Sequence, residues 1–178
     1  MASLSPWSPV LAAAGFHKPL LANERRFGFA VRICLAVAIV FGSHYLLSRG
    51  AWKDSVSSFH AAAVALIMLT VTGVFQDMAA HRRKLAGYWR TLPLSTAHWT
   101  VAELAIGGLL LLAVVALYSV VHAIAGTLTV GEATSFIVGT SAAVPLLRWT
   151  QRRRLETSFV WSLCAVVLWA WLMASWFR

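Results

Sequence analysis

The stretch that decides the fold is residues 100–125, TVAELAIGGLLLLAVVALYSVVHAIA, in which Glu103 is the only charged residue. A helix that crosses the hydrocarbon core of a bilayer needs about 20 mainly apolar residues. This run is long enough, so we expect it to be a membrane-spanning helix. A basic, aromatic segment precedes it, and shorter apolar runs lie on either side.

The composition extends this interpretation to the whole chain. Of its 178 residues, 60% are hydrophobic and 12% are charged, and the mean hydropathy is +0.74. Soluble domains carry about 25% charged residues. We therefore predict an integral membrane protein of the all-α class, a polytopic bundle of transmembrane helices, and exclude a soluble enzyme. The net charge of +9 does not indicate nucleic-acid binding, because the basic residues stand in short clusters beside apolar runs.

Five apolar segments are predicted to span the membrane, at about residues 28–47, 58–75, 100–125, 130–147 and 158–177. Each is close to the length of about 20 residues that a bilayer requires. The fourth is short and ends at Pro145. Residues 28–178 would thus form one transmembrane domain.

Residues 1–27 precede this domain. They make a poor signal peptide, because no Lys or Arg stands ahead of the short apolar run 10–14, and we expect them in the mature protein. Residues 20–27, LLANERRF, favour a short amphipathic helix that lies in the membrane interface. A flexible tail is the alternative interpretation.

Most Lys and Arg residues fall on one side of this five-span topology. They cluster in residues 18–32, 82–90 and 148–154, whereas Arg49, Lys53 and Arg178 fall on the other side. Basic residues near helix ends are retained in the cytoplasm. The N-terminus is therefore expected inside and the C-terminus outside, in what we expect to be a bacterial inner membrane. A fourth segment that only dipped into the bilayer would place the last cluster on the wrong side.

The predicted cytoplasmic loop of residues 76–99 is the one sizeable polar island in the middle of the chain. It holds HRRKLAGYWRTLPLSTAHW at residues 81–99, with four Lys/Arg residues, an aromatic pair and a Leu-Pro-Leu turn. Such a loop is a candidate contact for a soluble partner. At its end, Thr100-Val-Ala-Glu103 matches a capping box, which predicts a structural role for Glu103. If the helix begins earlier, at Ser95, Glu103 would lie two turns inside and would need an arginine partner.

Two further groups of residues are candidates for binding or packing. His44, His60 and His122 would lie at similar depth on the outer side, where three imidazoles can bind zinc or copper. The alternative is that each is an interfacial side chain with an apolar body and a hydrated tip. Ser135, Gly139 and Ala143 recur every fourth residue, which is typical of a face for close helix packing.

The first half of the chain resembles the type-2 ABC transporter permeases. The residues that carry this resemblance are Glu24-Arg-Arg26 before the first span, two spans, and Gly87-Tyr-Trp-Arg-Thr-Leu-Pro-Leu-Ser95 before a long apolar span. In that family the corresponding loop includes the coupling helix that docks on the ATPase subunit. The resemblance implies that residues 77–90 are the coupling segment and residues 92–95 the turn into the third span. The family usually has six spans, so a five-span chain would be a reduced half-transporter that needs a partner permease or a second copy, or a relative that has become an accessory subunit.

The leading hypothesis is therefore a non-catalytic membrane subunit of an ABC-type exporter that binds a partner ATPase. The candidate partner-binding residues are Asp77, Arg82, Arg83, Lys84, Tyr88, Trp89, Arg90 and Pro93. The chain contains no phosphate-binding G-x-x-x-x-G-K loop and no H-E-x-x-H or G-x-S-x-G motif, so ATP would act only through that partner, and no cofactor of its own is expected. The alternatives are a structural or assembly subunit of a larger membrane complex, and a metal- or haem-handling protein that uses the three histidines.

Overall fold

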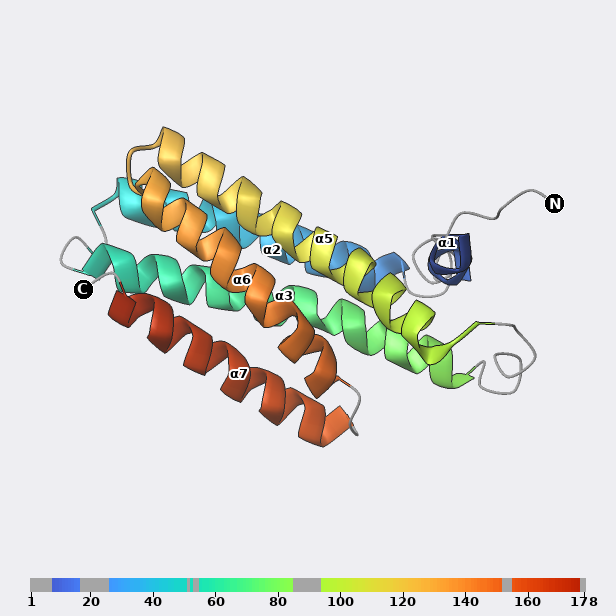
Figure 1. Ribbon diagram of the computed structural model, residues 1–178. Coiled ribbons are helices and arrows are strands. Elements are labelled where there is room, and N and C mark those ends of the chain that lie inside the picture. The colour runs from blue at the N-terminus through green and yellow to red at the C-terminus, as the bar shows by residue number, and fades with distance from the viewer. Residues whose placement is uncertain are drawn as a thin grey trace.

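The computed structural model describes residues 8–16, 26–50, 52, 55–84, 94–151 and 155–176. In these ranges the chain forms six helices (Figure 1). They are α1 (Ser8–Phe16), α2 (Arg26–Ser48), α3 (Val56–Lys84), α5 (Thr96–Ile124), α6 (Val130–Thr150) and α7 (Leu155–Trp176). Five of them, α2, α3, α5, α6 and α7, are long and apolar enough to cross a membrane, which confirms the predicted all-α bundle and its five segments. The helix of the fourth segment continues through Pro145 to Thr150.

The helix α3 lies at the centre of the bundle. It packs against α2, α5, α6 and α7. Of its apolar span, 56% is buried inside the molecule, against 17–39% for the spans of the other four long helices. Its fully buried residues Val64, Ile67, Met68, Val71 and Met78 form the middle of the hydrophobic core. The outward faces of α2 and α7 remain rich in exposed apolar side chains, as expected for helices that contact lipid.

The five long helices run up and down in sequence, so alternate helix ends meet (Figure 1). One end holds the starts of α2, α5 and α7 and the last turns of α3 and α6; we call it the basic end, because Arg32, Arg82, Arg83 and Arg148 lie there. The other end holds His44, His60 and His122 and is called the histidine end. At the basic end α3 and α5 project beyond the ends of α6 and α7 (Figure 1). Each projecting helix has 29 residues.

The structure corrects the predicted bounds of the polar loop. The second span was expected to end at residue 75, but α3 continues to Lys84, and α5 begins at Thr96. Residues 76–84 and 96–99 are therefore helical: residues 76–84 consist largely of good helix formers, and the N-cap at Ser95 starts α5 at Thr96. Of the predicted loop, residues 85–93 lie outside the described residues.

The predicted capping role of Glu103 is wrong. The N-cap of α5 is Ser95, whose side chain accepts a hydrogen bond from the His98 backbone N–H, while the His98 ring accepts one from the Ser95 N–H. This reciprocal pair satisfies the free N–H groups at the helix start. Glu103 consequently lies two turns inside α5, and the alternative in which it needs an arginine partner is confirmed.

The N-terminal segment contains a helix that the sequence analysis did not predict. The predicted interfacial helix at residues 20–27 lies outside the described residues, apart from the first turn of α2. Instead α1 packs against the start of α5, where Ala13, Trp99 and Ala102 form a small separate core. This contact fixes α1 beside the projecting part of α5.

Candidate coupling site at the basic end

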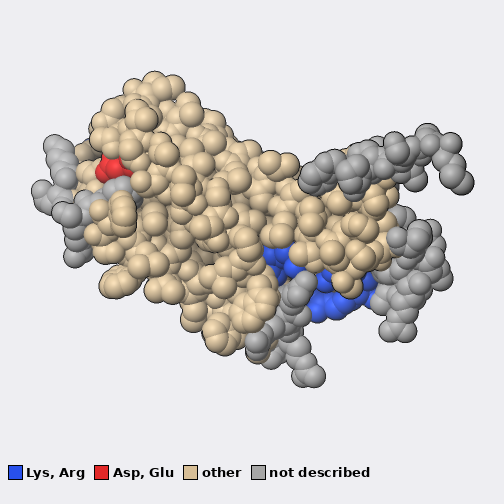
Figure 2. Space-filling view, in the orientation of Figure 1, with Lys and Arg blue, Asp and Glu red and all other residues tan. Residues whose placement is uncertain are grey.

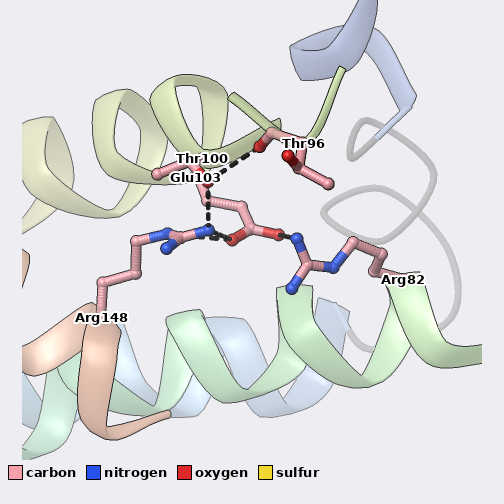
Figure 3. A network of polar contacts seen from close by, with 5 residues as sticks. All are labelled: Arg82, Thr96, Thr100, Glu103 and Arg148. Atoms are coloured by element: carbon pink, nitrogen blue, oxygen red, sulfur yellow. Dashed lines mark hydrogen bonds and ion pairs between the residues drawn. The ribbon is translucent and has the colours of Figure 1, made fainter. Parts of the chain in front are cut away.

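A buried carboxylate joins three helices at the basic end (Figure 3). Glu103 of α5 accepts hydrogen bonds at Oε2 from Arg148 of α6, at 2.6 Å from Nη2 and 3.1 Å from Nε. Its other oxygen, Oε1, lies 3.4 Å from Nη1 of Arg82 on α3. Thr100, one turn before Glu103, accepts a further hydrogen bond from Arg148 Nη2 at 3.1 Å. We call Arg82, Thr100, Glu103 and Arg148 the basic-end clamp.

The members of the basic-end clamp differ in exposure. The side chains of Glu103 and Arg148 are 5% and 7% exposed, whereas that of Arg82 is 30% exposed. A buried charge is tolerated when a partner neutralises it and hydrogen bonds satisfy its polar atoms, and removing one partner leaves an uncompensated charge. The basic-end clamp therefore links the last turn of α3 and the last turn of α6 to a point two turns inside α5.

A second ion pair joins α2 to α3. Arg32 Nη1 lies 3.0 Å from Asp77 Oδ2. The guanidinium passes directly over Gly73, where a Cβ atom would collide with it. Gly73 is thus the residue that lets the Arg32 side chain approach the α3 backbone and reach Asp77 one turn further along.

A neutral network of hydrogen bonds ties the start of α7 to α3 and to the end of α6. Gln76 donates to Ser158 Oγ at 3.2 Å, and Ser158 donates to Gln151 Oε1 at 3.2 Å. Gln151 in turn donates to Ser162, which lies 2.8 Å from the Thr150 hydroxyl. Through Ser158 the start of α7 is therefore bonded to the central helix α3 as well as to Gln151 at the end of α6.

The predicted partner-binding residues are only partly described. Asp77 is buried in its pair with Arg32, Arg82 belongs to the basic-end clamp, and Arg83 is exposed. Lys84 is the last residue of α3, and its side chain is not described. Tyr88, Trp89, Arg90 and Pro93 lie outside the described residues. Figure 2 shows Lys and Arg gathered toward the end of the molecule where α1 lies.

The three histidines at the opposite end meet, as their predicted depth indicated. The ring centroids of His60 and His122 lie 4.8 Å apart, and those of His44 and His122 lie 5.9 Å apart. Among the described residues, however, no group of three or more His, Cys, Asp or Glu is placed to hold a metal ion.

Protein groups hydrogen-bond the ring nitrogens of two of these histidines. His60 Nδ1 lies 2.6 Å from the Tyr118 hydroxyl, and its Nε2 lies 2.9 Å from the Thr127 carbonyl oxygen. His122 Nε2 lies 2.9 Å from Ser43 Oγ, and its Nδ1 lies 2.9 Å from Thr127 Oγ1. The arrangement in the structure is thus a hydrogen-bonded junction of α2, α3 and α5 with the turn after α5.

The small-residue strip of α6 contacts the chain's own α7. A Cβ atom at Gly139 would meet Met173 and Trp169 at 3.1–3.2 Å. Ala143 packs against the hydrophobic core, while Ser135 bonds back to the Gly131 carbonyl oxygen of its own helix. At Gly139 the strip is therefore occupied within the molecule.

Sequence reasoning missed the pairing of Arg32 with Asp77 and the role of Arg148. The signal was present, since a charged residue inside an apolar run needs a partner at membrane depth. The sequence did not indicate which residue is the partner, because Glu103 and Arg148 are 45 residues apart and meet only through the antiparallel packing of α5 and α6. Comparisons of the chain with protein-family models, with curated proteins and with solved structures found no match.

Proposed function

We propose that this chain is the non-catalytic membrane subunit of an ABC-type exporter, which docks a partner ATPase through residues 77–99. In this proposal the chain pairs with a second permease or a second copy of itself, and the ATPase supplies the ATP chemistry. The observation that carries the proposal is the basic-end clamp, because it links the helices on both sides of residues 85–93 to a third helix.

In this proposal the basic-end clamp transmits a movement of residues 85–93 to α3, α5 and α6. These residues connect the end of α3 to the start of α5, so a partner bound there pulls or pushes both helices. Glu103 passes a shift of α5 to α6 through two hydrogen bonds to Arg148.

Helix lengths also support docking at this end. At a rise of about 1.5 Å per residue, a helix of 29 residues is roughly 43 Å long, against about 30 Å for the hydrocarbon core. The surplus of α3 and α5 projects at the basic end (Figure 1), which would hold residues 85–93 away from the lipid and within reach of a soluble protein. Packing of α1 against Trp99 and Ala102 stiffens the projecting part of α5.

The charge distribution supports a cytoplasmic location of the basic end in this proposal. The helices place Arg26, Arg32, Arg82, Arg83, Lys84 and Arg148 at the basic end, and Arg49 lies at the other end. Because basic residues beside spans are retained in the cytoplasm, the basic end would face the cytoplasm, where an ATPase finds its nucleotide.

The proposal is tested by purifying the tagged protein from its native membrane in a mild detergent and identifying the proteins that accompany it. We expect a P-loop ATPase that is lost when Tyr88 and Trp89 are both replaced by Ala. The matched control is Trp52→Ala, which removes an exposed tryptophan from the histidine end. Recovery of the protein alone, or with other membrane subunits and no ATPase, contradicts the proposal and favours a structural or assembly subunit.

A further inference from the structure

A cavity of about 260 Å³ lies between α2 and α7 on the surface of α3, near the basic end. The two flanking helices each pack on α3. Leu35 of α2 and Phe159 of α7, at 52% and 61% exposed, stand among its lining residues. The cavity therefore opens sideways, toward the surface that the bundle presents to lipid.

The lining of this cavity changes character along the bundle axis. Toward the basic end it contains Arg32, Gln76, Gln151 and Ser162. Deeper in the bundle its walls include Leu35 of α2, Leu69 of α3 and Thr70, whose hydroxyl is bonded back to the Leu66 carbonyl oxygen, while the Phe159 ring stands on the side nearer the basic end. A ligand with a polar group at the mouth of the cavity and an apolar chain toward its interior would match this gradient. An amphiphile in a bilayer leaflet has this form.

The sign of the polar group follows from the side chains at this end. A guanidinium carries five N–H donors and no acceptor, and the Arg32 side chain uses Nη1 for its ion pair with Asp77. The helices place Arg26, Arg32, Arg82, Arg83, Lys84 and Arg148 at this end, and these basic residues outnumber the three carboxylates Asp77, Glu103 and Glu156. Phosphate oxygens are strong acceptors for such donors, and the surplus of positive charge favours an anion.

We propose that this cavity binds the anionic phosphate headgroup of a membrane phospholipid, with Arg32 as its charged partner and its acyl chain along Leu35 and Leu69. The network of Gln76, Gln151 and Ser162 keeps the polar wall rigid, because each of these side chains is already hydrogen-bonded to a neighbouring helix or turn. Binding uses this subunit alone and does not depend on the proposed partnership with an ATPase.

The test is lipid binding to the purified detergent-solubilised protein, measured by native mass spectrometry with phosphatidylglycerol and, separately, phosphatidylcholine of the same acyl chains. Both lipids carry the phosphodiester, but phosphatidylcholine adds a choline cation that the guanidinium of Arg32 and the surplus of positive charge repel, so we expect phosphatidylglycerol to bind about tenfold more tightly. Leu35→Trp fills the apolar part of the cavity and should weaken phosphatidylglycerol binding about tenfold. Phe41→Trp is its matched control on the same helix, because Phe41 is exposed to a similar extent, 55%, and should leave binding unchanged.

A charge variant tests the role of Arg32 without leaving a buried charge unpaired. The double substitution Arg32→Gln with Asp77→Asn removes both members of the ion pair and should abolish the preference for phosphatidylglycerol, while thermal unfolding reports whether the fold is kept. Equal binding of the two lipids by the unmodified protein, or equal effects of Leu35→Trp and Phe41→Trp, overturns the proposal. Competition by glycerol phosphate at the same concentration as the lipid also overturns it, because the ligand would then be a free phosphate compound.

Discussion

Replacing Glu103 by Gln should break the ion pairs of the basic-end clamp and destabilise the protein more than replacing a nearby exposed charge such as Arg83. The change leaves Arg148, only 7% exposed, without its carboxylate, and it leaves Arg82 without its contact at Oε1. Removing one partner of a buried ion pair costs about 3–5 kcal/mol. For a chain of this size each kcal/mol lowers the midpoint of thermal unfolding by about 2–4 °C, so we expect a fall of roughly 6–20 °C.

The assay is thermal unfolding of the detergent-solubilised protein, followed by circular dichroism, with two comparison variants. Arg83→Gln removes an exposed arginine next to Arg82 and should change the free energy of unfolding by no more than about 0.5 kcal/mol. Glu103→Gln combined with Arg148→Gln removes both buried charges and should recover most of the loss, because no unpaired buried charge remains. The reasoning is refuted if Glu103→Gln costs no more than Arg83→Gln, or if the double variant is as unstable as the sum of its two single changes.

The remaining predictions concern packing and the histidine end. Gly107→Ala should lower the free energy of unfolding by about 1–3 kcal/mol, because the new Cβ would collide with the Phe75 ring. Gly42→Ala is the control, since the space around its Cβ is open, and it should not destabilise the protein. Similar unfolding midpoints for the two variants would argue against this close contact between α3 and α5. Tyr118→Phe should lower the free energy of unfolding by about 1–3 kcal/mol, because it leaves the buried His60 Nδ1 without its hydrogen bond. Tyr45→Phe, at an exposed position, should leave the stability unchanged. An equal effect of the two substitutions would refute the hydrogen-bonded junction at the histidine end. Zn²⁺ should leave the unfolding midpoint unchanged, because protein groups bond the ring nitrogens of His60 and His122; a rise with metal concentration would restore the metal-site hypothesis.

Hydropathy was sufficient to predict the five long helices, because a membrane requires apolar runs of a fixed length and every backbone polar group in them must be bonded internally. It placed the end of the second span at residue 75, nine residues before α3 ends. Polar residues such as Gln76, Asp77 and His81 interrupt the apolar run but do not interrupt the helix. Gln76 bonds to Ser158 of α7, Asp77 pairs with Arg32 of α2, and His81 is buried. Hydropathy therefore predicts the apolar part of α3, whereas the helix itself continues to Lys84.

The candidate site was less predictable from sequence. Two capping patterns begin within five residues of each other, at Ser95 and at Thr100, and local sequence does not decide between them. In the structure α5 is capped at Ser95, and Glu103 bonds instead to Arg148, which lies 45 residues further along the chain. The histidines illustrate the same limit: their common depth follows from topology, but their role depends on Ser43, Tyr118 and Thr127, which no spacing rule links to them.

The central proposal is that the segment of residues 77–99 docks a partner ATPase on the side of the membrane that the basic end faces. The most direct measurement replaces Trp89 with a photoreactive phenylalanine analogue in living cells, irradiates them, and identifies the cross-linked product by mass spectrometry. The proposal predicts a covalent product with a P-loop ATPase from position 89 and none from the same probe at Trp52, at the histidine end. Absence of that product at position 89, or equal yields from the two positions, would contradict it.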